Sequence, residues 1–177
     1  MLVLVVGPSG VGKDTLLDGA RTVLVDDPGV VFPRRQITRP AEAGGEDHIP
    51  ISEAEFAARD AAGGYALAWQ AHGLSYGLAA DIEADLAAGR TVVANVSRQV
   101  LEAARRRYGA VRVVSVTADA QVLAERLRQR GRESEADIAR RLARAEAVEV
   151  AGDDVTVLRN DGPPQDGVDQ LVAAIRR

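Results

Sequence analysis

The chain has 177 residues, enough for one domain that buries roughly 70% of its unfolded surface. Its formal net charge of −4 gives no general attraction to nucleic acid or to a membrane, and the absence of cysteine excludes disulfides, thiolate catalysis and cysteine-ligated metals. The apolar run before the first glycine is too short for a signal peptide or a membrane span, so we expect a cytoplasmic protein.

Strands and helices are predicted to alternate along most of the chain. Residues 2–6 form a continuous apolar run, typical of a strand buried on both faces of a parallel sheet. Strands of the same character are predicted at 91–96, 111–116 and 155–158. Apolar residues recur at helical spacing over 16–24, 79–88, 100–107, 120–130, 135–150 and 167–175. The alternation predicts an α/β fold in which helices cover a parallel sheet, and we expect five strands in that sheet although only four apolar runs are visible.

A phosphate-binding motif connects the first strand to the first helix. The segment Gly7-Pro8-Ser9-Gly10-Val11-Gly12-Lys13 has the pattern GxxxxGK. In such a loop the backbone N–H groups curl around a phosphate, the helix N-terminus adds positive partial charge, and the lysine reaches the β and γ oxygens. Lys13 is also the single lysine beside 21 arginines. We therefore predict a P-loop that binds ATP through residues 7 and 9–15, with Lys13 in a catalytic role.

Position 14 departs from the usual motif, which has a magnesium-binding Ser or Thr hydroxyl there. Asp14 offers a carboxylate, which is a good Mg²⁺ ligand but adds negative charge beside the phosphates. We expect ATP binding to depend more steeply on Mg²⁺ than in a loop with Ser or Thr. Thr15 is the alternative ligand, although its side chain lies about 100° around the helix from the side chain of Asp14.

Residues 34–77 interrupt the alternation with several glycines and prolines and one short helix. Ser52 and Glu55 have the spacing of a capping box, which predicts the N-terminus of that helix. We predict an acceptor-binding insertion here and a core made of residues 1–33 and 78–177. Within the insertion, Arg39 lies where an anionic acceptor would enter.

The second half of the chain predicts a helical lid over about residues 130–141. Gly131 interrupts two arginine-rich helical segments, so the lid could bend over the nucleotide. Arg130 and Arg141 are predicted to stabilise the charge of the transferred phosphoryl group, as an arginine finger does. No general base is evident, and an acceptor phosphate needs none because it is largely ionised near neutral pH.

Nearly the whole chain resembles the guanylate-kinase branch of the nucleoside monophosphate kinases. The matching stretches are GPSGVGKD, ITRP, GGEDHI, SYG, RGRESEADIARRL and RND. The resemblance implies a P-loop NTPase fold, assigns both lid arginines to Arg130 and Arg141, and places Asn160 where those kinases contact adenine. It also assigns acceptor phosphate contacts to Arg39 and Tyr76.

The acceptor side differs from the guanylate-kinase pattern. The second phosphate-binding arginine falls on Glu42, a phosphate-binding tyrosine falls on His48, and the acid that holds guanine falls on Leu67. A hydroxyl residue of the base pocket falls on Leu78. Leucines cannot hydrogen-bond a base edge, so we expect an acceptor without guanine.

With TRPAEAGGEDHI and WQAHGLSYG, the chain is similar to the ribose 1,5-bisphosphate phosphokinase family of bacterial phosphonate breakdown. The resemblance implies Mg²⁺-dependent transfer from ATP to ribose 1,5-bisphosphate, a small phosphorylated sugar, giving 5-phosphoribosyl 1-diphosphate and ADP. Four further residues are candidates for binding the ribose hydroxyls: Asp47, His48, Gln70 and His72.

Three alternatives remain open from the residues. The first is a guanylate kinase with a divergent base pocket, and the second is a non-catalytic guanylate-kinase-like module that binds a protein. The intact cradle and arginines argue against the second alternative. The third is a P-loop kinase acting on a sugar alcohol, which would want a carboxylate base.

Overall fold

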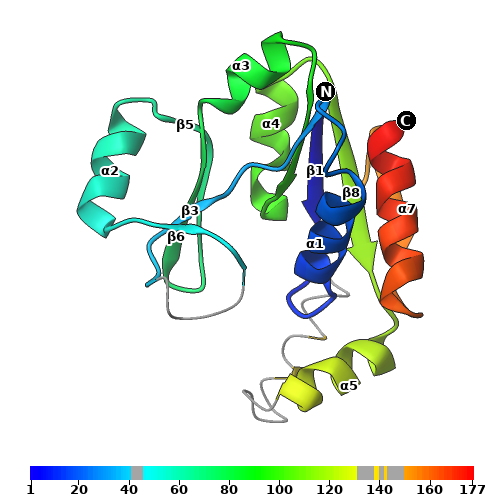
Figure 1. The fold of residues 1–177 in the computed structure, drawn as a ribbon. Helices are drawn as coiled ribbons and strands as arrows, with labels where there is room; N and C mark the ends of the chain where they lie inside the picture. The colour runs from blue at the N-terminus through cyan, green and yellow to red at the C-terminus, as the bar shows by residue number, and fades with distance from the viewer. Residues whose placement is uncertain (41–45, 131–137, 140–141, 143–149) are drawn as a thin grey trace. The chain divides into compact units, whose positions relative to one another are not determined.

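The computed structural model describes residues 1–40, 46–130, 138–139, 142 and 150–177. The chain divides into two compact units, which are described separately below (Figure 1). One unit comprises residues 1–4 and 27–111, and the other comprises residues 5–26 and 112–177. None of the helices in these described ranges is both long and apolar enough to cross a membrane.

The central sheet has five strands in the order β2-β7-β1-β8-β9. Its strands are β1 (Leu2–Val6), β2 (Val30–Val31), β7 (Thr91–Asn95), β8 (Val111–Thr117) and β9 (Val155–Arg159). All five residues of β1 are buried, because a strand covered on both faces has no polar side. The pairs β2–β7 and β8–β9 are parallel. The predicted five-stranded parallel sheet is confirmed, and its fifth member, β2, is too short to show as an apolar run.

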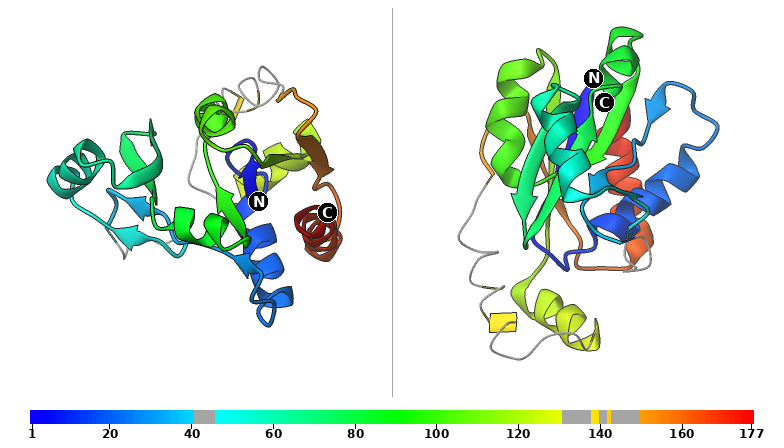
Figure 2. Two further views of the ribbon diagram at one scale, coloured as in Figure 1. Left: turned by 90° about the horizontal axis from the view of Figure 1, so that it is seen from above. Right: turned by 90° about the vertical axis from the view of Figure 1, so that its left-hand side faces the viewer.

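In the unit of residues 5–26 and 112–177, the helices whose bounds the structure describes are α1 (Lys13–Val23), α5 (Ala120–Arg130) and α7 (Pro164–Arg176). Helix α1 packs against α7, which also contacts β9 and is seen end-on in the left view of Figure 2. A Cβ on Gly19 would come within 2.4 Å of Val168, so glycine permits this close approach. The apolar face of α5 contributes Leu123, Ala124 and Leu127 to a cluster with Ile138 and Leu142.

The other unit contains a second sheet that the sequence did not reveal, with strand order β4-β3-β6-β5. Its strands are β3 (Gln36–Ile37), β4 (Ile49–Pro50), β5 (Tyr65–Ala71) and β6 (Leu74–Ala79). The β5–β6 hairpin turns on His72 and Gly73, whose φ angles of 53° and 74° are those of a tight two-residue turn. Helix α2 (Glu53–Ala61) packs on β5 and β6 and lies in front of them in the right view of Figure 2.

Two predicted boundaries shift in this unit. The helix predicted from residue 79 begins three residues later, as α3 (Ile82–Ala87), because Ala79 still pairs with Tyr65 in the hairpin. For the same reason the predicted insertion boundary at residue 77 falls inside β6. The predicted capping box is confirmed, since Ser52 Oγ accepts from the Glu55 N–H and the Glu55 carboxylate accepts from the Ser52 N–H. The unit ends with the 3-10 turn η2 (Arg98–Val100) and α4 (Leu101–Arg107).

Candidate active site

The glycine-rich loop runs from the end of β1 to the start of α1, as its motif predicts. Gly10 and Gly12 have φ angles of 90° and 98°, which L side chains rarely adopt. Close packing excludes side chains there as well, because a Cβ on Gly10 would lie 2.8 Å from Leu127 Cδ2. The loop conformation therefore depends on glycine at both positions.

Lys13 lies at the first position of α1 with its ammonium group over the loop. Lys13 Nζ donates to the carbonyl oxygens of Gly7 and Pro8, at 2.8 and 3.0 Å. These bonds keep the positive charge beside the loop backbone, where a terminal phosphate would lie in a nucleotide complex. Asp14 and Thr15 follow in the first helical turn, and both residues are exposed. The donor set fits a triphosphate, and the Asp14 carboxylate is suited to Mg²⁺.

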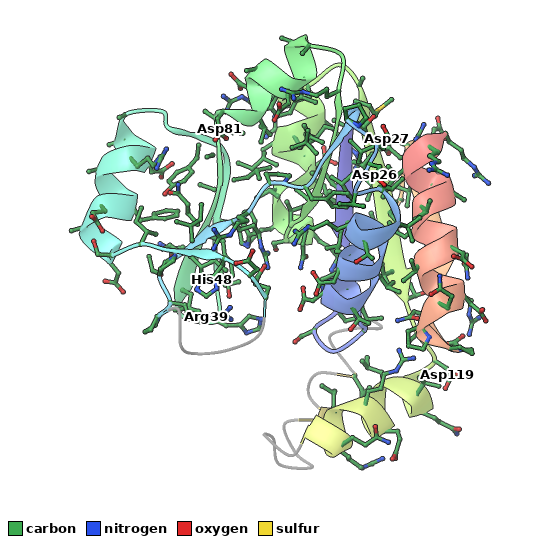
Figure 3. The ribbon with its side chains drawn as sticks, viewed as in Figure 1. Asp26, Asp27, Arg39, His48, Asp81 and Asp119 are labelled. Atoms are coloured by element: carbon green, nitrogen blue, oxygen red, sulfur yellow. The ribbon has the colours of Figure 1, made fainter. Side chains whose placement is uncertain are left out.

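The turn after β9 contacts this loop through the side chain of Asn160. Asn160 is only 5% exposed, and its Nδ2 donates to the Val11 carbonyl at 2.8 Å. The next residue, Asp161, accepts a hydrogen bond from the N–H of Asp119, the residue directly before α5. Asp119 is labelled in Figure 3. That hydrogen bond, followed by the contact with Arg159, holds the pKa of Asp161 below its usual value, while partial desolvation opposes the shift.

The predicted lid arginines fall at the limit of the described residues. Arg130 is the last residue of α5, and of Arg130 only the backbone is described. Arg141 lies outside the described residues, as does Glu42. Their roles stay predictions.

In the other unit, the predicted acceptor residue Arg39 is bound closely to His48 (Figure 3). Arg39 Nη2 lies 3.2 Å from His48 Nδ1, and His48 Nε2 lies 3.1 Å from the Arg39 carbonyl oxygen. His48 is 5% exposed and also contacts the Glu46 carbonyl oxygen. Both ring nitrogens are therefore engaged by protein atoms, so the structure presents His48 as a support for Arg39 rather than as a group open to ribose hydroxyls.

Tyr76 lies close to two arginines in this unit. Burial raises the pKa of Tyr76, and the positive charges of Arg35 and Arg39 lower it in part. Its ring stacks on Trp69, with centroids 5.5 Å apart and planes 4° from parallel. The two arginines therefore place positive charge in the surroundings of the Tyr76 hydroxyl.

Sequence reasoning missed Arg35, which holds the aromatic pair in place. Its guanidinium lies 5.3 Å from the Tyr76 ring centroid and 5.7 Å from that of Trp69, and it forms a two-pronged ion pair with Glu46. Both partners of the ion pair are largely buried. Residues 35 and 46 meet through the pairing of β3 with β4, so no short motif could have shown this contact.

The remaining acceptor candidates lie at the surface. Asp47 is exposed and pairs with Arg34 at 2.8 Å, Gln70 is exposed near the end of β5, and His72 is exposed in the hairpin turn. By contrast, Leu67 and Leu78 are cross-strand partners with exposed fractions of 5% and 0%. The two positions that would bind guanine are thus occupied by buried hydrocarbon.

Comparisons with known proteins agree with this architecture. The family model described as guanylate kinase matches residues 1–164, so the chain belongs to the guanylate kinase family. A relative from Rhodopseudomonas palustris named ribose 1,5-bisphosphate phosphokinase PhnN is 49% identical over 175 residues, covering 99% of this chain and 88% of the relative. A relative of the same name from Agrobacterium fabrum is 45% identical, with 99% and 96% covered.

Among solved structures, guanylate kinase from Anaplasma phagocytophilum superposes with a TM-score of 0.64, covering 99% of this chain and 84% of that one. The two sequences are 18% identical, so this likeness concerns the fold. The predicted P-loop α/β fold is thereby confirmed.

Proposed function

We propose that the chain is a ribose 1,5-bisphosphate phosphokinase, which transfers the γ-phosphoryl group of ATP to the 1-phosphate of ribose 1,5-bisphosphate. The bond between the γ-phosphorus and the β-γ bridging oxygen breaks, and the bridging oxygen leaves as part of ADP. An oxygen of the 1-phosphate forms the new bond, giving 5-phosphoribosyl 1-diphosphate. Because that oxygen is already ionised near neutral pH, no protein base is required.

The observation that carries this proposal is the buried pair Leu67 and Leu78 in a unit that retains Arg39 and Tyr76. A purine acceptor is recognised through hydrogen bonds to the edge of its base. An enzyme whose pocket makes these bonds strongly favours acceptors that carry the base. Here Arg39 and Tyr76 would remain as anion contacts, while the base contacts are replaced by hydrocarbon. The names of the relatives from R. palustris and A. fabrum agree with an acceptor that has no base.

The chemistry required of the protein is positioning and charge neutralisation. The loop N–H groups and Lys13 would hold the β- and γ-phosphates, and Asp14 would be the protein ligand of Mg²⁺, which supplies further positive charge to the phosphate oxygens when bound. Arg130 and Arg141 would act on the transferred group. Arg39 and Tyr76 would orient the acceptor through its phosphate, with Asp47, Gln70 and His72 as candidate contacts to the sugar.

A direct assay tests the proposal. Purified protein is incubated with ATP and Mg²⁺ and with either ribose 1,5-bisphosphate or GMP, and products are identified by phosphorus NMR. We expect a new diphosphate on the ribose and little GDP. Efficient turnover of GMP, or no transfer to ribose 1,5-bisphosphate, would overturn the proposal. Lys13→Ala is the control for contaminating kinases, since removal of one preorganised charge-stabilising group lowers kcat by about 10²–10³.

A further inference from the structure

The Asn160 side chain connects two parts of the chain that are 149 residues apart, through its hydrogen bond to the Val11 carbonyl. Val11 is fully buried and lies in the middle of the phosphate-binding loop. The resemblance to guanylate kinases assigned Asn160 to the adenine base, but its Nδ2 atom is directed at the loop backbone.

The backbone of Asn160 is fixed on both sides. Its N–H donates to the Thr117 carbonyl at 2.8 Å, which continues the pairing of β8 with β9. Its carbonyl accepts from Arg126 Nη1 of α5 at 2.7 Å. Because neither bond involves the side chain, the amide is held at the loop by a frame that does not depend on a nucleotide.

The amide also fits a space that two glycines leave open. A Cβ on Gly12 would lie 2.6 Å from Nδ2, and a Cβ on Gly167 would lie 2.9 Å from Oδ1. The amide orientation follows from chemistry, because the Val11 carbonyl is an acceptor and must face the NH₂ group. Oδ1 is then buried without a hydrogen-bond partner in the described part of the chain. Burial of Oδ1 without a partner costs free energy. We therefore attribute the presence of asparagine at this position to the hydrogen bond between Nδ2 and the Val11 carbonyl.

The hydrogen bond fixes a peptide plane of the cradle. In a trans peptide the C=O and N–H groups point in opposite directions. When Asn160 holds the Val11 carbonyl, the N–H of Gly12 is therefore directed away from Asn160. That N–H belongs to the loop whose amides surround a bound phosphate.

We propose that Asn160 is a positioning residue for the phosphate cradle. Its amide holds the Val11–Gly12 peptide in the orientation that presents the Gly12 N–H to a nucleotide phosphate. The inference rests on the triphosphate-binding part of the proposed function and is independent of which acceptor the enzyme uses.

Inorganic tripolyphosphate separates this role from a contact with the base, because it has the phosphates of ATP and no adenine. Binding of ATP and of tripolyphosphate is measured by calorimetry with Mg²⁺ for the wild type and for Asn160→Ala. Loss of the hydrogen bond should lower the affinity for both ligands by the same factor, about tenfold. In assays of transfer, the KM for ATP should rise while the KM for the acceptor stays constant.

The control is Val172→Ala, which removes buried apolar atoms from α7 in the same unit and lowers the stability, while the sequence of the loop and Asn160 are unchanged. Its affinity for both ligands should stay within about twofold of the wild type. Asn160→Asp keeps the shape of the side chain but offers no donor, so it provides the same test if Asn160→Ala does not fold. Asn160→Asp should lower the affinity for both ligands at least as much as Asn160→Ala, because a carboxylate would face the Val11 carbonyl.

Two results would overturn the inference. A loss of ATP affinity with unchanged tripolyphosphate affinity would show a base contact, and unchanged affinity for both would show no role in the cradle. If the wild type binds both ligands but does not phosphorylate ribose 1,5-bisphosphate, the proposed acceptor is wrong while the measurement on Asn160 still stands. If the wild type binds neither ligand, both proposals are wrong.

Discussion

Arg39 and His48 contact each other through both nitrogens of the imidazole ring. Nε2 lies 3.1 Å from the Arg39 carbonyl oxygen, and the guanidinium Nη2 lies 3.2 Å from Nδ1. Nδ1 also lies 3.1 Å from the Glu46 carbonyl oxygen, so the ring joins Arg39 to the start of the segment that leads into β4. Since Arg39 Nε is buried without a partner in the described part of the chain, the side chain depends on His48 for its orientation.

Substitution of His48 should therefore act on the acceptor through Arg39. We expect His48→Ala to raise the KM for ribose 1,5-bisphosphate about tenfold and to leave the KM for ATP unchanged, as measured from initial rates with each substrate varied. Unfolding in urea should show a loss of about 1–3 kcal/mol, because the contacts of the buried imidazole with the Arg39 and Glu46 carbonyl oxygens are removed. Arg59→Ala, an exposed change on α2 in the same unit, is the control. Equal changes in both KM values would contradict the role given to His48.

Tyr76 provides a second test of the acceptor site, because its hydroxyl can be removed while its ring remains. Tyr76→Phe preserves the stack on Trp69 and the contact with Arg35, so the free energy of unfolding should change by less than about 0.5 kcal/mol. The KM for ribose 1,5-bisphosphate should rise about tenfold if the hydroxyl contacts its phosphate. An unchanged KM would exclude that contact.

Trp69 is the only tryptophan, so its fluorescence reports on the acceptor unit directly. Titration of the wild type with ribose 1,5-bisphosphate should change the emission, since the Tyr76 ring is stacked on the indole. The same titration of Tyr76→Phe should need more ligand to reach the midpoint. This measurement separates weaker binding from slower transfer.

The sequence predicted those features whose causes are local or repeated. Strands β1, β7 and β8 are recognisable because each is an apolar run whose middle is buried in the parallel sheet, whereas β9 is a shorter apolar run at the edge of that sheet, where only Leu158 is buried. The capping box of Ser52 and Glu55 and the GxxxxGK loop are short motifs whose spacing is itself the physical requirement.

In the second sheet, β3 and β4 were missed because they have only two residues each, too few to show an alternating pattern. Strands β5 and β6 have seven and six residues, but their burial does not alternate from one residue to the next. The site was predicted unevenly for a related reason. The ion pair of Arg35 with Glu46 and the bond of Asn160 to Val11 join residues that chain folding alone brings together. A pairing of this kind leaves no mark on local spacing, so the resemblance gave Asn160 a role at the base while its side chain contacts the loop.

Substitution of Asp14 tests whether this residue is a ligand of Mg²⁺. In the absence of Mg²⁺ its carboxylate repels the phosphates of ATP, whereas with Mg²⁺ it would serve as a ligand. We therefore expect the ratio of ATP affinities with and without Mg²⁺ to be about tenfold smaller in Asp14→Ser than in the wild type. Calorimetry at several Mg²⁺ concentrations measures this ratio, with Thr15→Ala as the matched variant on the same helical turn. If Thr15→Ala changes the ratio and Asp14→Ser does not, the ligand is Thr15.

The last prediction concerns Tyr108, which follows α4 and donates to Glu83 Oε1 at 3.1 Å. Glu83 also binds Arg107, whose other nitrogen donates to the carbonyls of Tyr65 and Ala66 in β5. Burial, followed by the hydrogen bond and the negative charge of Glu83, raises the pKa of Tyr108 to about 12, against the lowering effect of Arg107. This network connects the end of α4 to the strand that carries Leu67 and Trp69.

The direction of the pH dependence follows from linkage. An unfolded tyrosine loses its proton near pH 10, whereas folded Tyr108 keeps it up to about pH 12. The stabilising contribution is therefore complete below about pH 10 and is lost as the pH rises from there through about 12. Tyr108→Phe has no proton to lose, so the stability advantage of the wild type over this variant should shrink in urea unfolding between pH 9 and about pH 11. Tyr65 and Tyr76 titrate in both proteins, so the difference isolates Tyr108. A difference that stays constant across this range would mean that the Tyr108 hydroxyl is neither buried nor bound to Glu83.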